Sequence, residues 1–311
     1  MSQSVSAPTR SASYSVLTNR QSATAGASAS ASCFDPAILA SAAAGKLPAD
    51  QQQAVTQHLA ACPACQKLRS QMLEQLAAWS GRFLYKGHLV WPNDWSWLAP
   101  YEKYLGPDAA GGLPKTRIID RRFTLIQLAH AVNQLGGSTA ECGVLGGVGS
   151  AMICKTLEGT YQATERHWGF DSFEGLPQPD KIDLSSHSWQ KKGSLAISPQ
   201  VALNNLADFE FCTLVKGWIP NCFEPAQAHR FRLVHIDLDL YQPTLDSLQF
   251  FYPRTNAGGV FVLDDYGHLT CPGVRQAVDE FFADKQEPVI ESVCGTAFVF
   301  KATSTSPDIH T

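Results

Sequence analysis

The stretch AECGVLGGVGSAMICKTL, residues 140–157, decides the fold. It begins as a short apolar strand, turns through glycines at positions 143, 146, 147 and 149, and continues in a helical pattern. Such a unit opens a nucleotide-binding domain, because glycine lets backbone approach a ligand closely and a helix amino terminus favours negative charge or lone pairs. A dinucleotide fingerprint would need a glycine where Met152 stands, and the Lys-Ser/Thr pair of a P-loop is absent. The pattern therefore argues against NAD and ATP.

The next strand pattern indicates which ligand the loop serves. HWGFDSFEGLP, residues 167–177, ends its apolar part at Asp171. An acid at this place in a nucleotide-binding unit can accept hydrogen bonds from ribose hydroxyls. Together, the glycine loop and Asp171 favour an adenosine cofactor that carries no phosphates.

The rest of the large domain alternates strand and helix patterns. This alternation argues for an α/β fold with a doubly wound, mainly parallel sheet and helices on both faces. Strands are expected at 211–219, 232–240 and 258–266, and helices at 121–137, 198–207, 244–254 and 273–284, with a terminal strand pair at 289–293 and 296–301.

Four aspartates lie within or at the end of two of these strands. HIDLDL places Asp237 and Asp239 in what should be a buried strand, and VFVLDD ends another strand in Asp264 and Asp265. Unpaired buried carboxylates are heavily penalised, so crowded acids must shift their pKa values, share protons or bind a hard cation. Asp237 and Asp239 should share one face, because strand side chains repeat every two residues. Alternatively, Asp237 or Asp239 caps the following helix, and Asp264 pairs with an arginine such as Arg254 or Arg275.

Several motifs in order carry a family resemblance. Residues 118–301 contain AECGVLGGVGS, FDSFEGLP, LVKGWIP, HIDLDLYQPTLDSL, GGVFVLDDYG and GVRQAVDEFF. This series resembles S-adenosylmethionine-dependent methyltransferases of the macrocin O-methyltransferase (TylF-like) family, which modify sugar hydroxyls of natural products. The resemblance implies a Rossmann-like methyltransferase sheet and a small hydroxylated acceptor.

The resemblance also implies roles for individual residues. A magnesium ion would be held by Asp237, Asp264 and Asp265. Asp239 would be the general base that accepts the acceptor's hydroxyl proton, with His268 as the second candidate. The cofactor would be bound by Glu141, Gly143, Gly147, Ser150, Asp171 and Ser172.

A smaller cysteine-containing module precedes this domain. Cys33, His58, Cys62 and Cys65 form C-x24-H-x3-C-x2-C, and the last three should lie on one helical face, with Pro63 in the first turn of a new helix. The four side chains suit a closed tetrahedral zinc site. The segment resembles the zinc-finger domain of bacterial anti-sigma factors, which implies a possible protein partner. A thioredoxin-like redox pair, Cys62 with Cys65, and ordinary buried side chains remain alternatives.

Composition divides the chain into five parts. Residues 1–32 are rich in Ser and Ala and contain no acid, so we expect a disordered tail, although a transit peptide has a similar composition. The zinc module is expected at 33–79, the methyltransferase domain at 118–303 and a short tail at 304–311. Residues 80–117 should form a linker and lid, whose Trp91, Trp95 and Trp97 either line an acceptor pocket or pack in a core.

Overall charge and hydropathy exclude some functions. A net charge of −4 gives no basic footprint for nucleic acid, and the N/D-P-P-Y motif of amino-directed nucleic-acid methyltransferases is absent. No apolar run is long enough to span a bilayer, and the nine cysteines are too sparse for a disulfide scaffold. We therefore expect a cytoplasmic, homo-oligomeric enzyme. A regulatory protein, whose zinc module binds a partner while the large domain senses cofactor, is the competing hypothesis.

Overall fold

A mixed sheet forms the centre of the molecule. The computed structural model describes residues 14–17, 49–67, 84–85, 88–89, 101, 104 and 119–302. Within these residues, eight strands pair in the order β1-β6-β5-β4-β7-β8-β10-β9. The strands are β1 Tyr14–Leu17, β4 Ser138–Cys142, β5 His167–Asp171, β6 Cys212–Gly217, β7 Phe231–Ile236, β8 Thr255–Leu263, β9 Ile290–Glu291 and β10 Ala297–Phe300. The neighbours from β6 to β8 are parallel, whereas β1, β10 and β9 pair antiparallel at the two edges.

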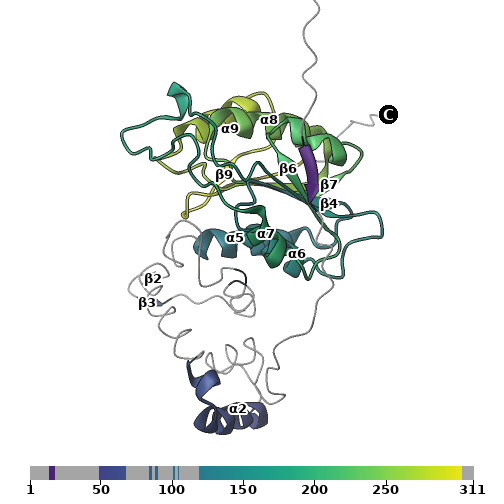
Figure 1. Ribbon diagram of the computed structural model, residues 1–311, viewed down its shortest axis with the longest axis vertical. Helices are drawn as coiled ribbons and strands as arrows, with labels where there is room; N and C mark the ends of the chain where they lie inside the picture. Colours follow the sequence, from purple (N-terminus) through teal and green to yellow (C-terminus); the bar gives the residue numbers. More distant parts are fainter. Residues whose placement is uncertain are drawn as a thin grey trace, which may run out of the picture.

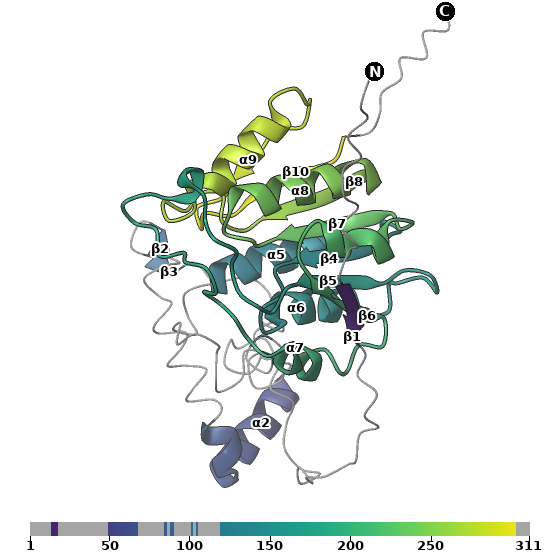
Figure 2. The same ribbon diagram turned by 45° about the horizontal axis from the view of Figure 1, so that its top comes forward.

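Helices cover both faces of the sheet, as expected from the alternating pattern. Figures 1 and 2 show α8 and α9 on one face and α5, α6 and α7 on the other. The elements are α5 Ile119–Ala131, α6 Val148–Thr156, α7 Pro199–Asn205, α8 Tyr241–Phe251 and α9 Pro272–Phe282, with the short 3-10 turns η1 Lys181–Asp183, η2 Asn221–Ala226 and η3 Tyr252–Arg254. The predicted α/β class and mainly parallel sheet are therefore confirmed.

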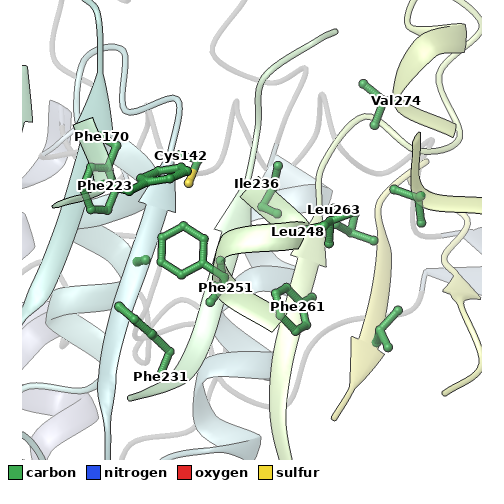
Figure 3. Close-up of a cluster of buried hydrophobic side chains, with 14 of the residues drawn as sticks. Cys142, Phe170, Phe223, Phe231, Ile236, Leu248, Phe251, Phe261, Leu263 and Val274 are labelled. Atoms are coloured by element: carbon green, nitrogen blue, oxygen red, sulfur yellow. The ribbon is translucent and has the colours of Figure 1, made fainter. Parts of the chain in front are cut away.

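Aromatic side chains fill the layer between the sheet and the helices α8 and α9. Figure 3 shows Phe170 and Phe231 from the strands packed with Phe223 of η2 and Phe251 of α8. Phe251 lies with its ring centroid 4.9 Å from that of Phe231 and 5.0 Å from that of Phe223, both in edge-to-face geometry. Each fully buried phenylalanine contributes roughly 1.5–3 kcal/mol of hydrophobic free energy, so this layer holds the strand ends in fixed positions.

The opposite face is covered partly by residues that precede the predicted domain. Tyr101 and Tyr104 are buried with Ile126, Val144 and Met152. The carbonyl of Tyr104 also accepts a hydrogen bond from the Asn205 side chain at 2.8 Å. The expected linker therefore contributes two side chains to the core beneath α6 and α7.

The sheet order places a crevice at the carboxyl end of β4. This strand lies between β5 and β7, so the connections on its two sides run in opposite directions. In open α/β sheets ligands bind outside the carboxyl ends of the strands at such a switch point. The ends of β4, β5 and β7 carry Cys142, Asp171 and Ile236, and each leads into a loop that contains predicted site residues.

Two expectations about elements are wrong. Tyr14–Leu17 is not disordered but forms β1, because the open edge of β6 offers unpaired backbone groups to an extended segment. The strand β7 ends at Ile236, so Asp237 and Asp239 lie in the turn before α8 rather than within a strand. Alternation of apolar residues continues through Leu240, but pairing with β4 and β8 stops at Ile236.

The smaller elements precede the sheet domain. The helix α2 spans Ala49–Ala61 and a second helical segment begins at Pro63, as the sequence predicted. A hairpin of β2 Leu84–Tyr85 and β3 His88–Leu89 lies within the expected linker. Cys33, the tryptophans at 91, 95 and 97 and the expected tail 304–311 lie outside the described residues. None of the described helices has the length and apolar character needed to cross a membrane.

Candidate active site

A cavity of about 340 Å³ opens at the carboxyl ends of β4, β5 and β7. Five of the predicted site residues line it, namely Gly143, Asp171, Ser172, Asp237 and Asp239. Part of its wall comes from the glycine loop and Asp171. Other lining residues come from the η1 region and the start of α8, including Asp180, Asp183, Gln242 and Asp246.

The glycines of the loop allow the chain to approach itself. Gly143 has a φ of +88°, and a Cβ there would overlap the carbonyl oxygen of Asp237. A Cβ on Gly149 would overlap the Glu141 carboxylate, which lies beneath the first turn of α6. We expected close backbone approach to a ligand, but the close neighbours here are Asp237 and Glu141. The glycines thus bring β4, the Asp237 turn and α6 together at one end of the cavity.

Asp171 joins two loops at the cavity wall. Its Oδ2 accepts the backbone N–H of Leu145 at 2.8 Å, and its Oδ1 accepts that of Phe173 at 2.7 Å. Burial raises the pKa of Asp171, although these backbone hydrogen bonds oppose the shift. The adjacent Ser172 donates to the Gly175 carbonyl at 3.2 Å. A carboxylate offers about four lone-pair sites, so Asp171 can still accept a bond from a ligand hydroxyl.

Glu141 and Ser150 lie beneath the cavity rather than on its wall. Glu141 is 1% exposed and accepts hydrogen bonds from Ser150 Oγ and, at 2.8 Å, from His235 Nδ1. His235 Nε2 lies 3.7 Å from Asp264 Oδ1. Burial lowers the pKa of His235, but the two flanking carboxylates outweigh it and raise the value to about 9. His235 is therefore an imidazolium that bridges two buried acids.

Two adjacent arginines of α5 neutralise part of the aspartate cluster. Arg121 Nη1 lies 2.8 Å from Asp264 Oδ2 and 3.0 Å from Asp265 Oδ1. Arg122 Nη2 lies 3.2 Å from Asp237 Oδ2. The expectation that Asp264 pairs with Arg254 or Arg275 is wrong. Arg254 donates hydrogen bonds to backbone carbonyls, and Arg275 pairs with Glu291.

Asp239 has a strained backbone and an altered pKa. Its φ is +60°, in the left-handed region that non-glycine residues rarely adopt and that is concentrated at functional sites. Burial, together with the charge of Asp237, raises the pKa of Asp239 to about 7. Its Oδ1 accepts a hydrogen bond from the Cys271 thiol at 3.5 Å. A carboxylate with this pKa can take up a proton near neutral pH.

The predicted magnesium ligands fall into two neighbouring groups. In the first group, potential ligand atoms of Asp237, Asp264 and His235 lie within 4.8 Å of one another. In the second group, those of Asp265, Asp239 and Cys271 lie within the same distance. The buried Oδ2 of Asp265 has no hydrogen-bond partner. Burial and the neighbouring carboxylates raise the pKa of Asp237, and they raise the pKa values of Asp239 and Asp265 to about 7. A divalent cation would relieve this crowding of carboxylates and would supply a partner for the orphaned Oδ2.

His268 lies away from the cavity. It is half-buried in a shallow surface hollow with Cys294 and Gly295, and its backbone N–H donates to the Asp265 carbonyl at 3.1 Å. Burial and the charge of Arg121 lower the pKa of His268. The structure therefore separates the two predicted bases, since Asp239 lines the cavity and His268 does not.

A second group of predicted ligands meets on the small module. His58, Cys62 and Cys65 offer ligand atoms within 4.8 Å of one another, and His58 Nε2 lies 3.3 Å from Cys65 Sγ. These are three members of the proposed zinc set. The fourth, Cys33, lies outside the described residues.

Sequence reasoning missed four residues of the site. Arg121 and Arg122 are adjacent basic residues at the start of a helix pattern, and this was the only local signal for them. Their acidic partners lie more than a hundred positions away in the sequence. His235 could have been found, because it precedes Asp237 by two positions in the same motif. Cys271 had no signal in the sequence.

Comparison with known proteins places this site in a family. The family model described as macrocin O-methyltransferase (TylF) matches residues 106–301. The chain belongs to the TylF family. Within the TylF match lie the glycine loop, Asp171, both arginines and the whole aspartate cluster.

Individual relatives of this TylF-family chain agree with that assignment. Demethyldecarbamoylnovobiocin O-methyltransferase of Streptomyces niveus is 27% identical over 160 residues, which cover 49% of this chain and 60% of the relative. A tetracenomycin-C 4'-O-methyltransferase of Streptomyces olivaceus, whose full name specifies a 2,3-dimethoxy-alpha-L-rhamnosyl group, is 27% identical over 180 residues, covering 55% and 67%. The chain thus spans about two thirds or less of the length of these curated relatives. The solved structure of the O-methyltransferase NovP superposes with a TM-score of 0.50 at 23% identity, covering 60% of this chain and 81% of NovP, which supports the fold.

Proposed function

We propose that the protein is an S-adenosylmethionine-dependent O-methyltransferase that acts on a hydroxyl of a small, glycosylated natural product. The observation that carries the proposal is one cavity that Asp171, Asp237 and Asp239 line together. Family membership supports the reaction class. The printed names of the curated relatives, which specify O-methylation and in one case a rhamnosyl group, support the acceptor class.

Asp171 and the glycine loop would bind the cofactor. The Asp171 carboxylate accepts hydrogen bonds from the backbone N–H groups of Leu145 and Phe173, which hold it beside the cavity. It can still accept a hydrogen bond from a ribose hydroxyl. Glu141 would act indirectly, because it holds Ser150 and His235 beneath the loop. When bound, S-adenosylmethionine supplies an electrophilic methyl group on a sulfonium.

Asp239 would be the general base. It borders the cavity, and a pKa of about 7 lets it accept the acceptor's hydroxyl proton at Oδ near neutral pH. Its side chain lines the same cavity as Asp171, so the base and the cofactor site face one space in which two reacting partners could be oriented. His268 is the weaker candidate because it does not line the cavity.

Asp237, Asp264 and Asp265 would hold a magnesium ion. The close approach of these carboxylates, which raises the pKa values of Asp237 and Asp265, and the orphaned Oδ2 of Asp265 support this assignment. A bound divalent cation would lower the pKa of a coordinated acceptor hydroxyl. Arg121 and Arg122 would hold the same carboxylates in place from the side of α5.

The small module would carry a structural zinc ion. Its ligands would be Cys33, His58, Cys62 and Cys65, and the close approach of the last three supports the set. A tetrahedral site of this kind supplies folding free energy to a segment too small for a large core.

Titration calorimetry on the full chain tests the proposal. S-adenosylmethionine should bind with micromolar affinity, and Asp171→Ala should weaken binding at least roughly tenfold, because one lost charge-assisted hydrogen bond is worth about 1.5–3 kcal/mol. Asp180→Ala, which removes another acid of the same cavity, is the matched control and should bind normally. Absence of binding in the presence and absence of magnesium would refute the methyltransferase assignment.

A further inference from the structure

A second cluster of potential metal ligands lies at the opposite end of the strands from the cavity. Cys154, His167 and Cys212 offer ligand atoms within 4.8 Å of one another. His167 and Cys212 are the first residues of β5 and β6, whereas the cavity lies at the carboxyl ends of the sheet. None of the three belongs to the site described above.

The sheet register brings the cluster together. His167 is the direct neighbour of Thr139 in β4 and of Cys212 in β6. Neighbouring residues in register on parallel strands point to the same face, so Thr139, His167 and Cys212 form a row across three strands. Cys154 of α6 covers this row, since α6 packs on the same face of the sheet (Figure 2).

The histidine is oriented as metal ligands usually are. Its Nδ1 lies 2.7 Å from Thr139 Oγ1, which in turn lies 2.7 Å from the Tyr161 hydroxyl. When Nδ1–H donates to Thr139 Oγ1 and the threonine hydroxyl donates to Tyr161, the lone pair on Nε2 is left for a metal. His167 is 0% exposed, and its Nε2 has no hydrogen-bond partner.

The two cysteines supply soft ligands beside this nitrogen. Cys154 and Cys212 are both reduced, and Cys154 is completely buried while Cys212 is partly exposed. A buried, unpartnered imidazole nitrogen costs free energy, and a cation held by two thiolates and this nitrogen would satisfy it. We propose that Cys154, His167 and Cys212 bind one thiophilic d10 metal ion, Zn²⁺ or Cu⁺.

The spacing of the ligand atoms suits such an ion. Zinc bonds to sulfur at about 2.3 Å and to imidazole nitrogen at about 2.0 Å, so its ligands lie within about 4 Å of one another. The cluster therefore needs to contract by less than about 1 Å. The partly exposed Cys212 gives an entry path for the ion. Two thiolates and one imidazole suit three-coordinate Cu⁺, or Zn²⁺ with a water molecule as fourth ligand.

Metal analysis of the full chain tests this proposal. The background is the Cys62→Ser, Cys65→Ser double variant, which removes the proposed amino-terminal zinc site. Anaerobically purified protein is loaded with Zn²⁺ or with Cu⁺ and dialysed against excess Mg²⁺, so that the proposed carboxylate site holds magnesium, and bound metal is counted by mass spectrometry. One equivalent of one of these ions should remain. It should be lost in Cys212→Ser and kept in Cys222→Ser, which makes the same change at a cysteine outside the cluster.

A second variant covers the case in which Cys212→Ser does not fold. Thr139→Val preserves side-chain volume but removes the hydrogen bond to His167 Nδ1, so it should weaken metal affinity roughly 10–100-fold in a chelator competition. Retention of the ion in Cys212→Ser, or no bound ion in the background protein, would overturn the proposal. A Cys154–Cys212 disulfide in the anaerobic protein would also overturn it and identify a redox pair instead.

Discussion

At the scale of single residues, His235 determines how the buried acids coexist. It lies between Glu141 and Asp264, and all three side chains are almost completely buried. Isolated buried carboxylates would be strongly destabilising, but an imidazolium between them offsets much of this cost. The arginines of α5 compensate the outer aspartates in the same way.

The first prediction concerns stability and pH. The pKa of His235 is about 9 in the folded chain against an ordinary value near 6.5, so its stabilising contribution is fully present below pH 6.5 and is lost as pH rises through 9. The free energy of unfolding should fall by on the order of 3 kcal/mol across this window. Denaturant titrations at several pH values, with chelator present, measure the fall. His235→Gln should be less stable at pH 6.5 and show little of this decline; an equally steep decline in the variant would contradict the assignment.

The second prediction concerns Asp239. If its carboxylate removes the acceptor proton, Asp239→Asn should lower kcat roughly 10²–10⁴-fold, because the amide cannot accept that proton. Binding of S-adenosylmethionine should be unchanged, since the cofactor residues are untouched. Asp246→Asn, at another carboxylate of the cavity wall, should keep most activity. Equal losses in both variants would mean that charge in the cavity, rather than a base at 239, supports the reaction.

The acids could be predicted from the sequence, but their partners could not. Asp237, Asp239, Asp264 and Asp265 end apolar runs, which is a local signal. Pairing with Arg121 and Arg122 depends on how α5 packs against the ends of β7 and β8, and no local pattern encodes that choice. The positive φ of Asp239 likewise arises from the turn into α8 and has no signal in residue type.

At the scale of elements, the packing of α6 on β4 depends on a missing side chain. The first turn of α6 lies directly over the Glu141 carboxylate, and Gly149 leaves the space that this carboxylate occupies. The helix and strand can approach because this position has no Cβ. Ser150 then donates to the same carboxylate and fixes the contact.

The third prediction tests this contact. Gly149→Ala places a methyl group against Glu141 and should destabilise the protein by roughly 1–3 kcal/mol, the usual cost of overpacking. Gly146→Ala is the matched control in the same loop, because its Cβ would lie 3.6 Å from Val201 Cγ1, an ordinary contact distance. Thermal melts of both variants give the comparison. Equal stability of the two would show that Glu141 moves aside without cost.

The alternating strand and helix patterns in the sequence correctly predicted which segments from α5 to β10 are helices and which are strands. Errors arose at boundaries, because the apolar alternation of I-D-L-D-L continues beyond the last residue that pairs with β4 and β8. A strand ends where its neighbours end, and that limit is a property of the whole sheet. The edge strand β1 was missed for a related reason, since its existence depends on a partner edge 200 residues away.

At the scale of the whole molecule, the domain includes residues before its family match. The TylF model begins at residue 106, but Tyr101 and Tyr104 are 1% and 4% exposed within the core under α6 and α7. The boundary of sequence similarity is therefore not the boundary of folding. Composition placed both tyrosines in a linker, because their burial partners are distant in sequence.

The fourth prediction follows from this burial. Tyr101→Ala should destabilise the full chain by roughly 3–5 kcal/mol, as large-to-small changes of buried aromatic residues do. Trp189→Ala, at a side chain that is 43% exposed, should cost much less. Equilibrium unfolding in urea measures both. A Tyr101→Ala protein as stable as Trp189→Ala would mean that the core does not require this segment.

The edge strand β1 and the buried Tyr101 attach the chain to the same domain at two separated points. The four-residue pairing of Tyr14–Leu17 with β6 is therefore an intramolecular association, maintained at an effective concentration set by the length of the intervening segment. A single peptide-bond cleavage between these two points would convert that pairing into a bimolecular equilibrium. So short a strand would then dissociate at ordinary protein concentrations, and the edge of β6 would become available to another extended chain.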